Sequence, residues 1–362
     1  MMRIIEVKLK NNPYKVYIGN SYIKNIPTYL SRLNLGDFGI IITSRKIFNL
    51  YKKLIERTFR KNCFKVIILR DGEAAKSTDS FFAVINKIAK IDGLNKKIFV
   101  ICLGGGTIGD IGGFVASIYK RGVPYVQIPT TLLAQIDSSI GGKTAINLPL
   151  AKNILGTFYQ PKAVFIDRVF LNTLPLTELK QGLAEAIKYG VIKNPDFFYF
   201  LKNNHKKIIA KKPECMQKII ETSTKIKIDI VENDEKETRG IRTILNFGHT
   251  FGHALESSLG YRNVSHGEAI ALGMLYAAKL SFMLNYCDRK SANAVEEIIK
   301  SFSLYRKINY NHRTLYKAIS YDKKFVSGKI RMVLLEKIGK VKVKEGLSSQ
   351  NIKKALTLFS KQ

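Results

Sequence analysis

The chain has 362 residues, a formal net charge of +32 and 46% hydrophobic residues. This length suits two domains better than one, and the hydrophobic content is ordinary for a globular protein with a sizeable core. No apolar run reaches the roughly 18 residues that a membrane-spanning helix needs, so we expect no membrane partner.

The cysteines and the first residues of the chain indicate its compartment. Cys63, Cys102, Cys215 and Cys287 are far apart, and none forms a Cys-x-x-Cys motif. This spacing favours free thiols in a reducing compartment over a disulfide framework or a cysteine metal site. The first residues also lack the apolar segment of a secretory signal peptide. We therefore expect a cytoplasmic protein.

The strong positive charge raises the alternative of nucleic-acid binding, because such a field attracts polyanions. The lysines are scattered through the chain and form no basic helix, and we find no helix-turn-helix, zinc-finger or RNP-like motif. A specific nucleic-acid partner is therefore not expected, although a basic scaffold without catalytic activity stays open as an alternative. Part of the charge suits an anionic substrate.

The first half of the chain alternates apolar strands with amphipathic helices. Strands are predicted at residues 38–43, 64–69 and 98–103, and helices at residues 45–59 and 78–91. Such a β-α-β-α order is typical of a mostly parallel sheet that binds nucleotides at the ends of its strands.

A glycine-rich turn follows the third of these strands. Gly104, Gly106 and Gly109 have the G-x-G-x-x-G spacing and precede a helix. Glycine lets the backbone approach a pyrophosphate, and the helix N-terminus offers unpaired N–H groups. The acidic residue expected about 20 positions later is absent, but Asp71, at the end of an earlier strand, suits a ribose instead. A dinucleotide site is predicted, with a ligand-free glycine turn as the alternative.

Residues 127–153 are dense in small polar side chains. The Gly-Lys-Thr sequence ending at Thr144 resembles a phosphate-binding P-loop, but Asp137 stands where that motif has its first glycine. A Walker-type NTPase is therefore not expected. Lys143, on a glycine-flanked loop, is still a candidate for contact with an anion, and Lys152 with Asn153 forms a second candidate.

The pattern changes after a strand predicted at residues 163–167. Beyond it the chain is helical almost to its end, apart from a strand pair near residues 330–335 and 340–343. We predict an α/β N-terminal nucleotide-binding domain at residues 1–174 and a mainly α-helical C-terminal domain, binding metal and substrate, at residues 175–362. The active site is expected in the cleft between them.

Three of the five histidines lie in one short segment. His249 and His253 are four residues apart in a run compatible with a helix, so both project from one helical face. His266 opens the next apolar-periodic run. Two imidazoles on a helix and a third nearby suit a zinc-like ion, completed by a carboxylate or water. From the spacing alone, three hydrogen-bonded histidines in a core or on a surface remain the alternative.

Seven short motifs occur in a characteristic order. They are Gly104-Gly105-Gly106-x-x-Gly109-Asp110, Tyr119-Lys120-Arg121-Gly122, Pro129-Thr130-Thr131-Leu132-Leu133-Ala134-Gln135, Asp137-Ser138-Ser139-x-Gly141-Gly142-Lys143-Thr144, Gly182-x-Ala184-Glu185-x-x-Lys188-Tyr189-Gly190, Leu245-Asn246-x-Gly248-His249-Thr250-x-Gly252-His253-Ala254 and His266-Gly267-Glu268-Ala269. Together they resemble the 3-dehydroquinate synthase family over nearly the whole chain.

The resemblance implies an NAD- and metal-dependent lyase that converts 3-deoxy-D-arabino-heptulosonate 7-phosphate to 3-dehydroquinate and phosphate in the shikimate pathway. The reaction combines transient oxidation by NAD, elimination of phosphate, re-reduction and an intramolecular aldol closure. It needs a dinucleotide site, a Lewis acid and a cationic cage for the anionic substrate. In this family the substrate's own phosphate is thought to accept the proton, so no single strong general base is expected.

The resemblance also implies which residues bind the cofactors. The ligands of a divalent zinc or cobalt ion would be Glu185, His249 and His266, with His253 as a nearby polar group that orients or relays protons. The NAD-binding residues would be Asp71, Gly72, Glu73, Ala74, Ala75, Lys76, Gly105, Gly106, Thr107, Ile108, Gly109, Asp110, Thr130, Thr131, Lys143, Lys152, Phe170, Leu171, Asn172 and Thr173. Lys143 equally suits the substrate.

The substrate cage and the catalytic groups follow in the same way. They would be Arg121, Asp137, Lys143, Asn153, Lys188, Lys227, Arg242, Asn246, His253 and Lys324. Arg121 is similar to an arginine that reaches the substrate phosphate across a homodimer interface, so a homodimer is expected. Residues 234–242 carry one residue more than the family's spacing, which leaves the register between Lys227 and Arg242 open.

Other enzymes of similar sequence remain alternatives. Related sugar-phosphate cyclases, such as 2-deoxy-scyllo-inosose synthase and the sedoheptulose 7-phosphate cyclases, share the fold and the metal ligands and differ at a few substrate-cage positions. A metal-dependent alcohol dehydrogenase resembling glycerol dehydrogenase is a more distant alternative. It has no need for so many anion-binding groups.

Overall fold

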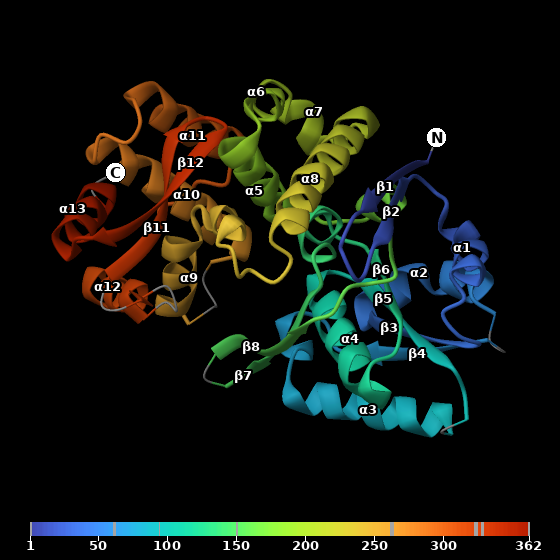
Figure 1. Cartoon of the computed structure of the whole chain (residues 1–362). Coiled ribbons are helices and arrows are strands. Elements are labelled where there is room, and N and C mark those ends of the chain that lie inside the picture. Colours follow the sequence, from blue (N-terminus) through green and yellow to red (C-terminus); the bar gives the residue numbers. More distant parts are fainter. Residues whose placement is uncertain are drawn as a thin grey trace. The chain divides into compact units, whose positions relative to one another are not determined.

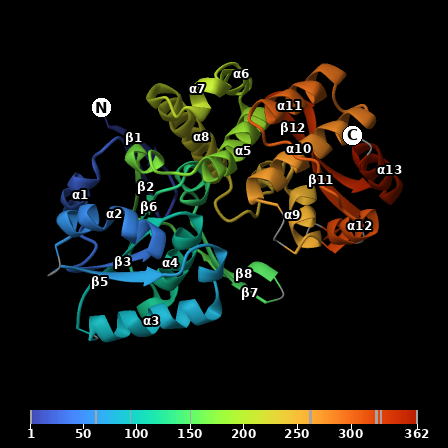
Figure 2. The ribbon, with the colours of Figure 1, turned by 180° about the vertical axis from the view of Figure 1, so that it is seen from behind.

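The computed structural model describes residues 2–60, 63–93, 95–149, 151–260, 264–321, 325–326 and 329–360. The chain forms two compact units (Figure 1, Figure 2). The first consists of Met1–Leu174 and Lys227–Lys236, and the second of Pro175–Ile226 and Glu237–Gln362. The division falls inside helix α8 (Pro213–Asn233), whose last residues belong to the first unit.

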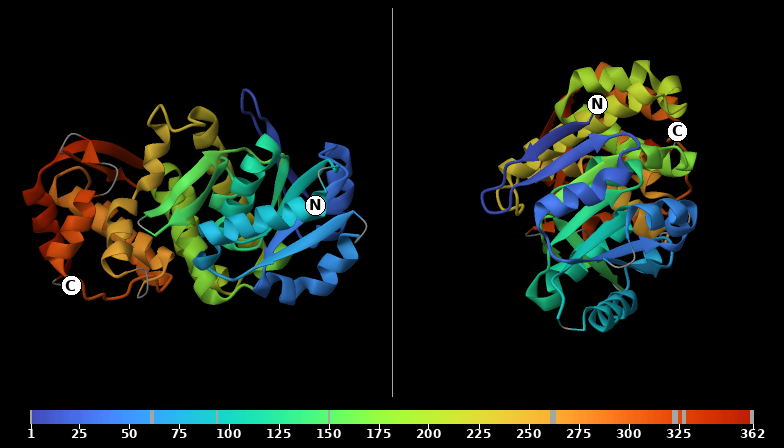
Figure 3. Two further views of the ribbon diagram at one scale, coloured as in Figure 1. Left: turned by 90° about the horizontal axis from the view of Figure 1, so that it is seen from below. Right: turned by 90° about the vertical axis from the view of Figure 1, so that its right-hand side faces the viewer.

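The first unit is built on a seven-stranded sheet with the order β1-β2-β9-β6-β5-β3-β4 (Figure 1, Figure 3). All neighbours are parallel except β1 and β2. The inner strands β3, β5, β6 and β9 are buried throughout, as expected where both faces of a parallel sheet are covered. The strands are β1 (Arg3–Val7), β2 (Tyr14–Gly19), β3 (Phe38–Ser44), β4 (Phe64–Leu69), β5 (Ile98–Gly104), β6 (Tyr125–Pro129) and β9 (Ala163–Asp167).

Helices cover the two faces of this sheet. Successive residues of one strand point to opposite faces, so Val100 and Cys102 pack with α3 and α4, whereas Ile101 packs with α1 and α2. The four helices are α1 (Ile26–Leu33), α2 (Arg45–Thr58), α3 (Thr78–Asp92) and α4 (Gly106–Ile118). The predicted α/β order is confirmed, and each predicted strand and helix of this unit ends within a residue or so of its observed bounds.

Several elements of the first unit were not predicted. They include the N-terminal pair β1 and β2, helix α1, strand β6, and a separate hairpin of β7 (Lys143–Leu148) and β8 (Ala151–Phe158). The hairpin falls in the stretch rich in small polar residues, and β8 is exposed along most of its length, so it carries no apolar alternation. β7 packs on α4, where a Cβ at Gly113 would lie 2.4 Å from Thr144 Cγ2.

The second unit is mainly helical, with a small antiparallel sheet of β10 (Phe325–Val326), β11 (Lys329–Lys337) and β12 (Lys340–Leu347). The predicted strand pair is therefore confirmed. The hydrophobic core of the second unit includes Phe251, Leu272, Tyr276, Leu315 and Leu334. Besides α8, its helices are α5 (Leu176–Lys193), α6 (Pro195–Asn203), α7 (His205–Ile209), α9 (His249–Ser258), α10 (His266–Met283), α11 (Arg289–Ser301), α12 (His312–Tyr321) and α13 (Ser349–Ser360).

None of the helices in the described part of the chain combines the length and the apolar character needed to cross a bilayer. All four cysteines are free thiols, as the spacing predicted.

Candidate active site

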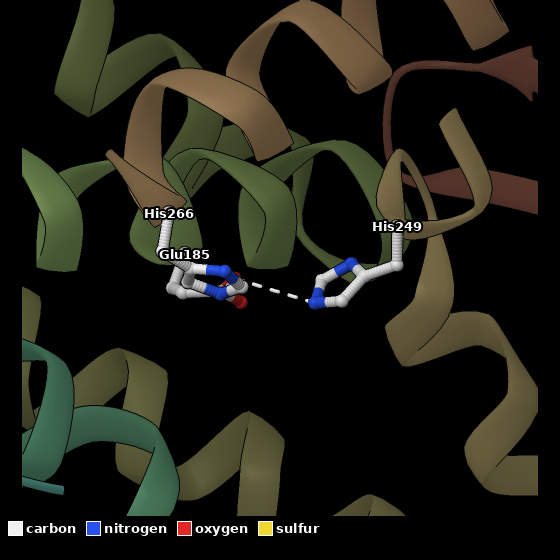
Figure 4. A group of neighbouring side chains, drawn as sticks. All are labelled: Glu185, His249 and His266. Carbon is white, nitrogen blue, oxygen red and sulfur yellow. Dashed lines mark ion pairs between the residues drawn. The ribbon is translucent and has the colours of Figure 1, made fainter. Parts of the chain in front are cut away.

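Three side chains from three helices of the second unit converge on one point (Figure 4). Glu185 lies on α5, His249 is the first residue of α9, and His266 is the first residue of α10. One ligand atom from each lies within 4.8 Å of the other two. Glu185 Oε1 is 3.5 Å from His249 Nε2 and 3.9 Å from His266 Nε2. The three atoms thus leave room for an ion between them.

Glycines bring these helices close together. A Cβ at Gly273 of α10 would lie 1.9 Å from the carbonyl oxygen of Gly248, which precedes α9 and has a φ of +82°. A Cβ at Gly267 would lie 2.5 Å from the Cα atom of Gln181 on α5. No side chain fits at these positions, so α5, α9 and α10 approach each other at backbone distance, and this approach carries the three ligands into one place.

A capping box fixes the start of α10. Ser265 Oγ accepts a hydrogen bond from the backbone N–H of Glu268, and Glu268 Oε2 accepts one of 2.9 Å from the backbone N–H of Ser265. This reciprocal arrangement satisfies amide groups that a helix start otherwise leaves unpaired. It holds His266 in the first helical turn.

The donor set fits a divalent metal ion. Glu185 is 1% exposed, and neither of its carboxylate oxygens accepts a hydrogen bond from the described residues, although Lys188 Nζ forms an ion pair with Oε2. A buried carboxylate is costly unless its charge is compensated. One carboxylate and two imidazoles are a common set for catalytic zinc and leave a coordination position open.

His253 lies with other side chains than its spacing in the sequence suggested. The spacing paired His249 and His253 as co-ligands, but the structure groups His249 with Glu185 and His266. His253 is instead grouped with Glu256 and His266, again within 4.8 Å. One helical turn separates the two histidines, and their ring centroids are 5.2 Å apart, so they face different carboxylates.

No role was predicted for Glu256 from the sequence. It is buried, and its Oε2 atom is 3.3 Å from Nδ1 of His266. Burial lowers the pKa of His266, but the hydrogen bond and charge of Glu256, together with the charge of Glu185, outweigh this and raise the pKa overall. The available signal was its position seven residues after His249, on the same helical face.

Three more predicted substrate-binding residues lie in the second unit. Lys188 and Arg242 are almost fully buried, and Arg242 Nε is 3.4 Å from Glu237 Oε1. Asn246 ends the short helix Ile241–Asn246, just before α9. Lys324 lies outside the described residues.

In the first unit, the glycine-rich turn joins β5 to α4 as predicted. A Cβ at Gly104 would lie 2.7 Å from Ile108 Cβ, and one at Gly109 would lie 2.6 Å from Gln127 Oε1. These glycines therefore let α4 pack closely on the sheet. The N-terminus of α4 stands at the carboxyl end of β5, which is where doubly wound proteins bind phosphate groups. Of the remaining loop residues, Thr107, Ile108 and Asp110 lie in the first turns of α4, and Gly105 and Gly106 begin it.

A network of polar side chains surrounds the buried Lys76. Its Nζ atom donates hydrogen bonds to Asp110 Oδ2 (2.7 Å) and to Asn153 Oδ1. Burial raises the pKa of Asp110 even though Lys76 lowers it. Glu73 Oε1 accepts a hydrogen bond of 2.8 Å from Asn147. Burial raises the pKa of Glu73, but Lys76 and Asn147 outweigh it and the net shift is downward. The network joins residues predicted for the cofactor with a residue predicted for the substrate.

Other predicted cofactor residues line the ends of the strands. Asp71 Oδ1 accepts a hydrogen bond from the backbone N–H of Lys46 at the start of α2 (2.9 Å). Gly72, Glu73, Ala74 and Ala75 form the turn and the short helix that follow Asp71. Thr131 Oγ1 accepts a hydrogen bond from Ala134 N (3.2 Å). The buried hydroxyl of Thr130 has no hydrogen-bond partner among the described residues, as expected of a group that meets a ligand.

The segment after β9 is buried at its first two predicted residues and exposed at the next two, Asn172 and Thr173. Phe170 and Leu171 are each 1% exposed, so a ligand would meet their main chain rather than their side chains. Asn172 caps the short helix that ends at Leu171, and the Thr173 hydroxyl hydrogen-bonds to Tyr51 Oη (2.5 Å).

The charged candidates of the first unit differ in their surroundings. Asp137 lies in a π-helix (Ala134–Ser138), a rare element that is frequent at functional sites, and it forms an ion pair with Lys227 of α8. Lys143 begins β7 rather than lying on a loop, and Lys152 lies in the exposed strand β8. Arg121 is exposed and has a φ of +63° in the turn after α4.

The comparison with known proteins decides the family. A model of the 3-dehydroquinate synthase N-terminal domain matches residues 66–181, and a model of the C-terminal domain matches residues 182–325. The chain belongs to the 3-dehydroquinate synthase family. A relative from Thermodesulfovibrio yellowstonii with that name is 43% identical over 359 residues, which cover 98% of this chain and 99% of the relative. The family inferred from the motifs is therefore confirmed, and the chain is an enzyme.

Solved structures of sugar-phosphate cyclases share the fold. The 2-epi-5-epi-valiolone synthase from Streptomyces hygroscopicus subsp. jinggangensis, with NAD+ and Zn2+ bound, has a TM-score of 0.88 and 24% identity over 98% of each chain. A 2-deoxy-scyllo-inosose synthase complexed with carbaglucose-6-phosphate, NAD+ and Co2+ has a TM-score of 0.89 and 23% identity over 98% of this chain and 99% of its own.

Proposed function

We propose that this chain is a 3-dehydroquinate synthase, a lyase that converts 3-deoxy-D-arabino-heptulosonate 7-phosphate to 3-dehydroquinate and phosphate. The observation that carries the proposal is the convergence of Glu185, His249 and His266 in a chain whose relatives bear this name over their full length. A biosynthetic role and free thiols also suit the cytoplasm as its compartment.

The metal site would consist of Glu185, His249 and His266. A bound zinc or cobalt ion supplies a Lewis acid for the substrate hydroxyl that is oxidised. Lys188 offsets part of the charge of the buried Glu185 carboxylate and keeps its Oε2 atom in place. Glu185 Oε1 then faces both imidazoles.

The first unit would hold the cofactor, and the bound NAD supplies the hydride acceptor and donor. The N-terminal amides of α4 suit the pyrophosphate. Asp71 and Glu73 suit ribose hydroxyls, because carboxylates accept hydrogen bonds from them. Lys76 would hold Asp110 and Asn153 in position through its two hydrogen bonds. The buried Thr130 hydroxyl offers a further donor or acceptor.

The cationic side chains would bind the phosphate and carboxylate groups of the substrate. Buried cations interact strongly with anions and need little reorganisation during the reaction. Lys188, Arg242 and Lys227 are all buried or nearly so. The exposed ring of His253 is the candidate for holding or relaying a proton. The remaining proposed substrate residues are Asp137, Lys143, Asn153, Asn246 and Lys324.

We also propose a homodimer in which Arg121 binds the substrate phosphate of the partner's site. Its exposure on a strained turn suits a side chain that reaches outward. An Arg121→Ala chain mixed with a His249→Ala chain would recover activity, because each mixed dimer then contains one complete site. If mixed dimers form and stay as inactive as the parents, the partner's arginine is not needed.

The experiment that tests the function is phosphate release from the heptulosonate 7-phosphate, with NAD and zinc present and NADH absorbance monitored. Glucose 6-phosphate and sedoheptulose 7-phosphate serve as parallel substrates. Release from the heptulosonate alone, without net NADH, is the expected result. Release from another sugar would instead assign a related cyclase such as 2-deoxy-scyllo-inosose synthase, whose fold is closely similar. Net NADH formation would contradict the proposal and indicate a dehydrogenase.

A further inference from the structure

Glu256 lies beside the proposed metal ligands but is not one of them. It is on α9, 7% exposed, and its Oε2 atom is 3.3 Å from Nδ1 of His266. The other nitrogen of that imidazole, Nε2, is 3.9 Å from Glu185 Oε1. The His266 ring therefore lies between two carboxylates, one on each of its nitrogens.

This placement decides which nitrogen can bind a metal. A neutral imidazole carries one N–H group, and an ionised carboxylate can only accept a hydrogen bond. The hydrogen bond between His266 and Glu256 therefore forms only when the proton is on Nδ1. The lone pair then lies on Nε2, which faces Glu185 and His249.

We propose that Glu256 is a positioning residue that fixes the tautomer and the ring orientation of His266, so that Nε2 binds the metal ion. The inference rests on the proposed function, because it requires an ion at Glu185, His249 and His266. Carboxylates that accept a hydrogen bond from a metal-binding histidine typically raise metal affinity by about 10- to 100-fold.

The structure also offers a competing arrangement. His253, Glu256 and His266 bring ligand atoms within 4.8 Å of one another, so an ion there would use Glu256 as a ligand and Nδ1 of His266. That arrangement would leave Glu185 almost fully buried with Lys188 alone as its counter-charge. Compensation of buried charge thus favours the ion at Glu185 and leaves Glu256 with the supporting role.

Two substitutions separate the contributions of Glu256. Glu256→Gln keeps a hydrogen-bond acceptor but removes the charge, and Glu256→Leu removes both at similar volume. The same two changes at Glu296 are the matched controls. Glu296 is a half-buried carboxylate of the second unit that pairs with Lys279 and Lys300 on α10 and α11. The Glu296 variants report the general effect of losing an ion-paired carboxylate from this unit.

The measurement is the zinc dissociation constant of the metal-free full-length protein, determined by competition with a chelator. The absorption spectrum of the cobalt-loaded protein and the melting temperature of the metal-free protein are recorded alongside. We expect Glu256→Leu to weaken zinc binding about 10- to 100-fold and Glu256→Gln to weaken it less. The cobalt spectrum should keep the wild-type coordination number, and both Glu296 variants should bind zinc like the wild type.

Each other outcome has a definite meaning. If both Glu256 variants bind zinc within twofold of the wild type, the inference is wrong. If the cobalt coordination number changes in Glu256→Leu, or in Glu256→Gln should the leucine variant not fold, Glu256 is a ligand and the inference is also wrong. In either case the proposed function still stands, because the wild type still releases phosphate. A wild-type protein that binds no metal and releases no phosphate instead contradicts the proposed function itself.

Discussion

Two pairs of a carboxylate and a lysine, one in each unit, differ in the hydrogen bonds that they form. In the first unit, the buried Lys76 donates hydrogen bonds to the partly buried Asp110 and to Asn153. In the second unit, Glu185 has an ion pair with Lys188, but its oxygens accept no hydrogen bond from the described residues. The first carboxylate accepts a hydrogen bond from its lysine, whereas the second has capacity left for a ligand. The same chemical pair thus joins a polar network in one unit and, as we propose, helps to hold a metal ion in the other.

The largest expected effect comes from replacing the unsatisfied carboxylate. Glu185→Gln should lower phosphate release by about 10³-fold, because a metal ligand worth several kcal/mol in the transition state is lost. The metal-free variant should also melt below the metal-free wild type, since Lys188 is then left buried without its counter-charge. Zinc stoichiometry, phosphate release and thermal melting measure these effects. A variant that binds zinc and releases phosphate like the wild type would show that Glu185 is not a metal ligand.

Replacing the lysine of the first unit should affect NAD binding rather than zinc binding. Lys76→Met leaves the partly buried Asp110 without its cation, which should cost about 3 kcal/mol of stability. NAD binding should weaken while zinc binding is unchanged. Burial already raises the pKa of Asp110, and loss of Lys76 raises it further. A raised carboxyl pKa costs stability above that pKa, so the deficit of the variant should shrink as the pH falls and Asp110 becomes protonated. Chemical unfolding at a series of pH values checks this, and a deficit that is independent of pH would contradict it.

A smaller effect is expected from a substitution that pushes α9 and α10 apart. Gly273→Ala should cost about 3 kcal/mol and weaken zinc binding, because the new Cβ meets the Gly248 carbonyl oxygen at 1.9 Å. Gly260→Ala is the matched control. Its φ is +61° with no atom within 4 Å of an added Cβ, so it should cost only about 1 kcal/mol and leave zinc binding unchanged. Equal losses of zinc affinity in the two variants would show that the approach of the helices does not matter.

The smallest effect is expected at a third buried carboxylate, Asp92. It accepts hydrogen bonds from Tyr119 Oη (2.9 Å) and Lys96 N (3.2 Å) and pairs with Lys120 Nζ (2.6 Å). Burial raises the pKa of Asp92, but Lys120 and Tyr119 outweigh it and the net shift is downward. Asp92→Asn should cost about 2 kcal/mol at neutral pH. A lowered pKa stabilises the fold above about pH 4 and loses this contribution as the pH falls further. Wild type and variant should therefore converge in acid, and a constant difference would show that the charge of Asp92 is not involved.

The local elements of the first unit could be predicted because each depends on neighbouring residues. The apolar runs of β3, β4, β5 and β9 and the glycine turn before α4 were found within a residue or so. The hairpin of β7 and β8 was not found, because its strands are stabilised by packing on α4 rather than by an alternating apolar pattern. The sequence also indicated histidines for a metal, yet the spacing alone paired His249 with His253.

The sequence by itself determined the alternation of strands and helices, the glycine turn at a strand end and, through its ordered motifs, the family. These features are encoded by residues that are neighbours in the chain. The grouping of Glu185 with His249 and His266 was implied by the family resemblance but not by residue spacing, and the tertiary structure brings the three together. Only the tertiary structure decided that Lys227 meets Asp137 and that Glu256 lies against His266. Those contacts join separate elements, and they exist because glycines let the helices pack at backbone distance and because buried charges must find partners.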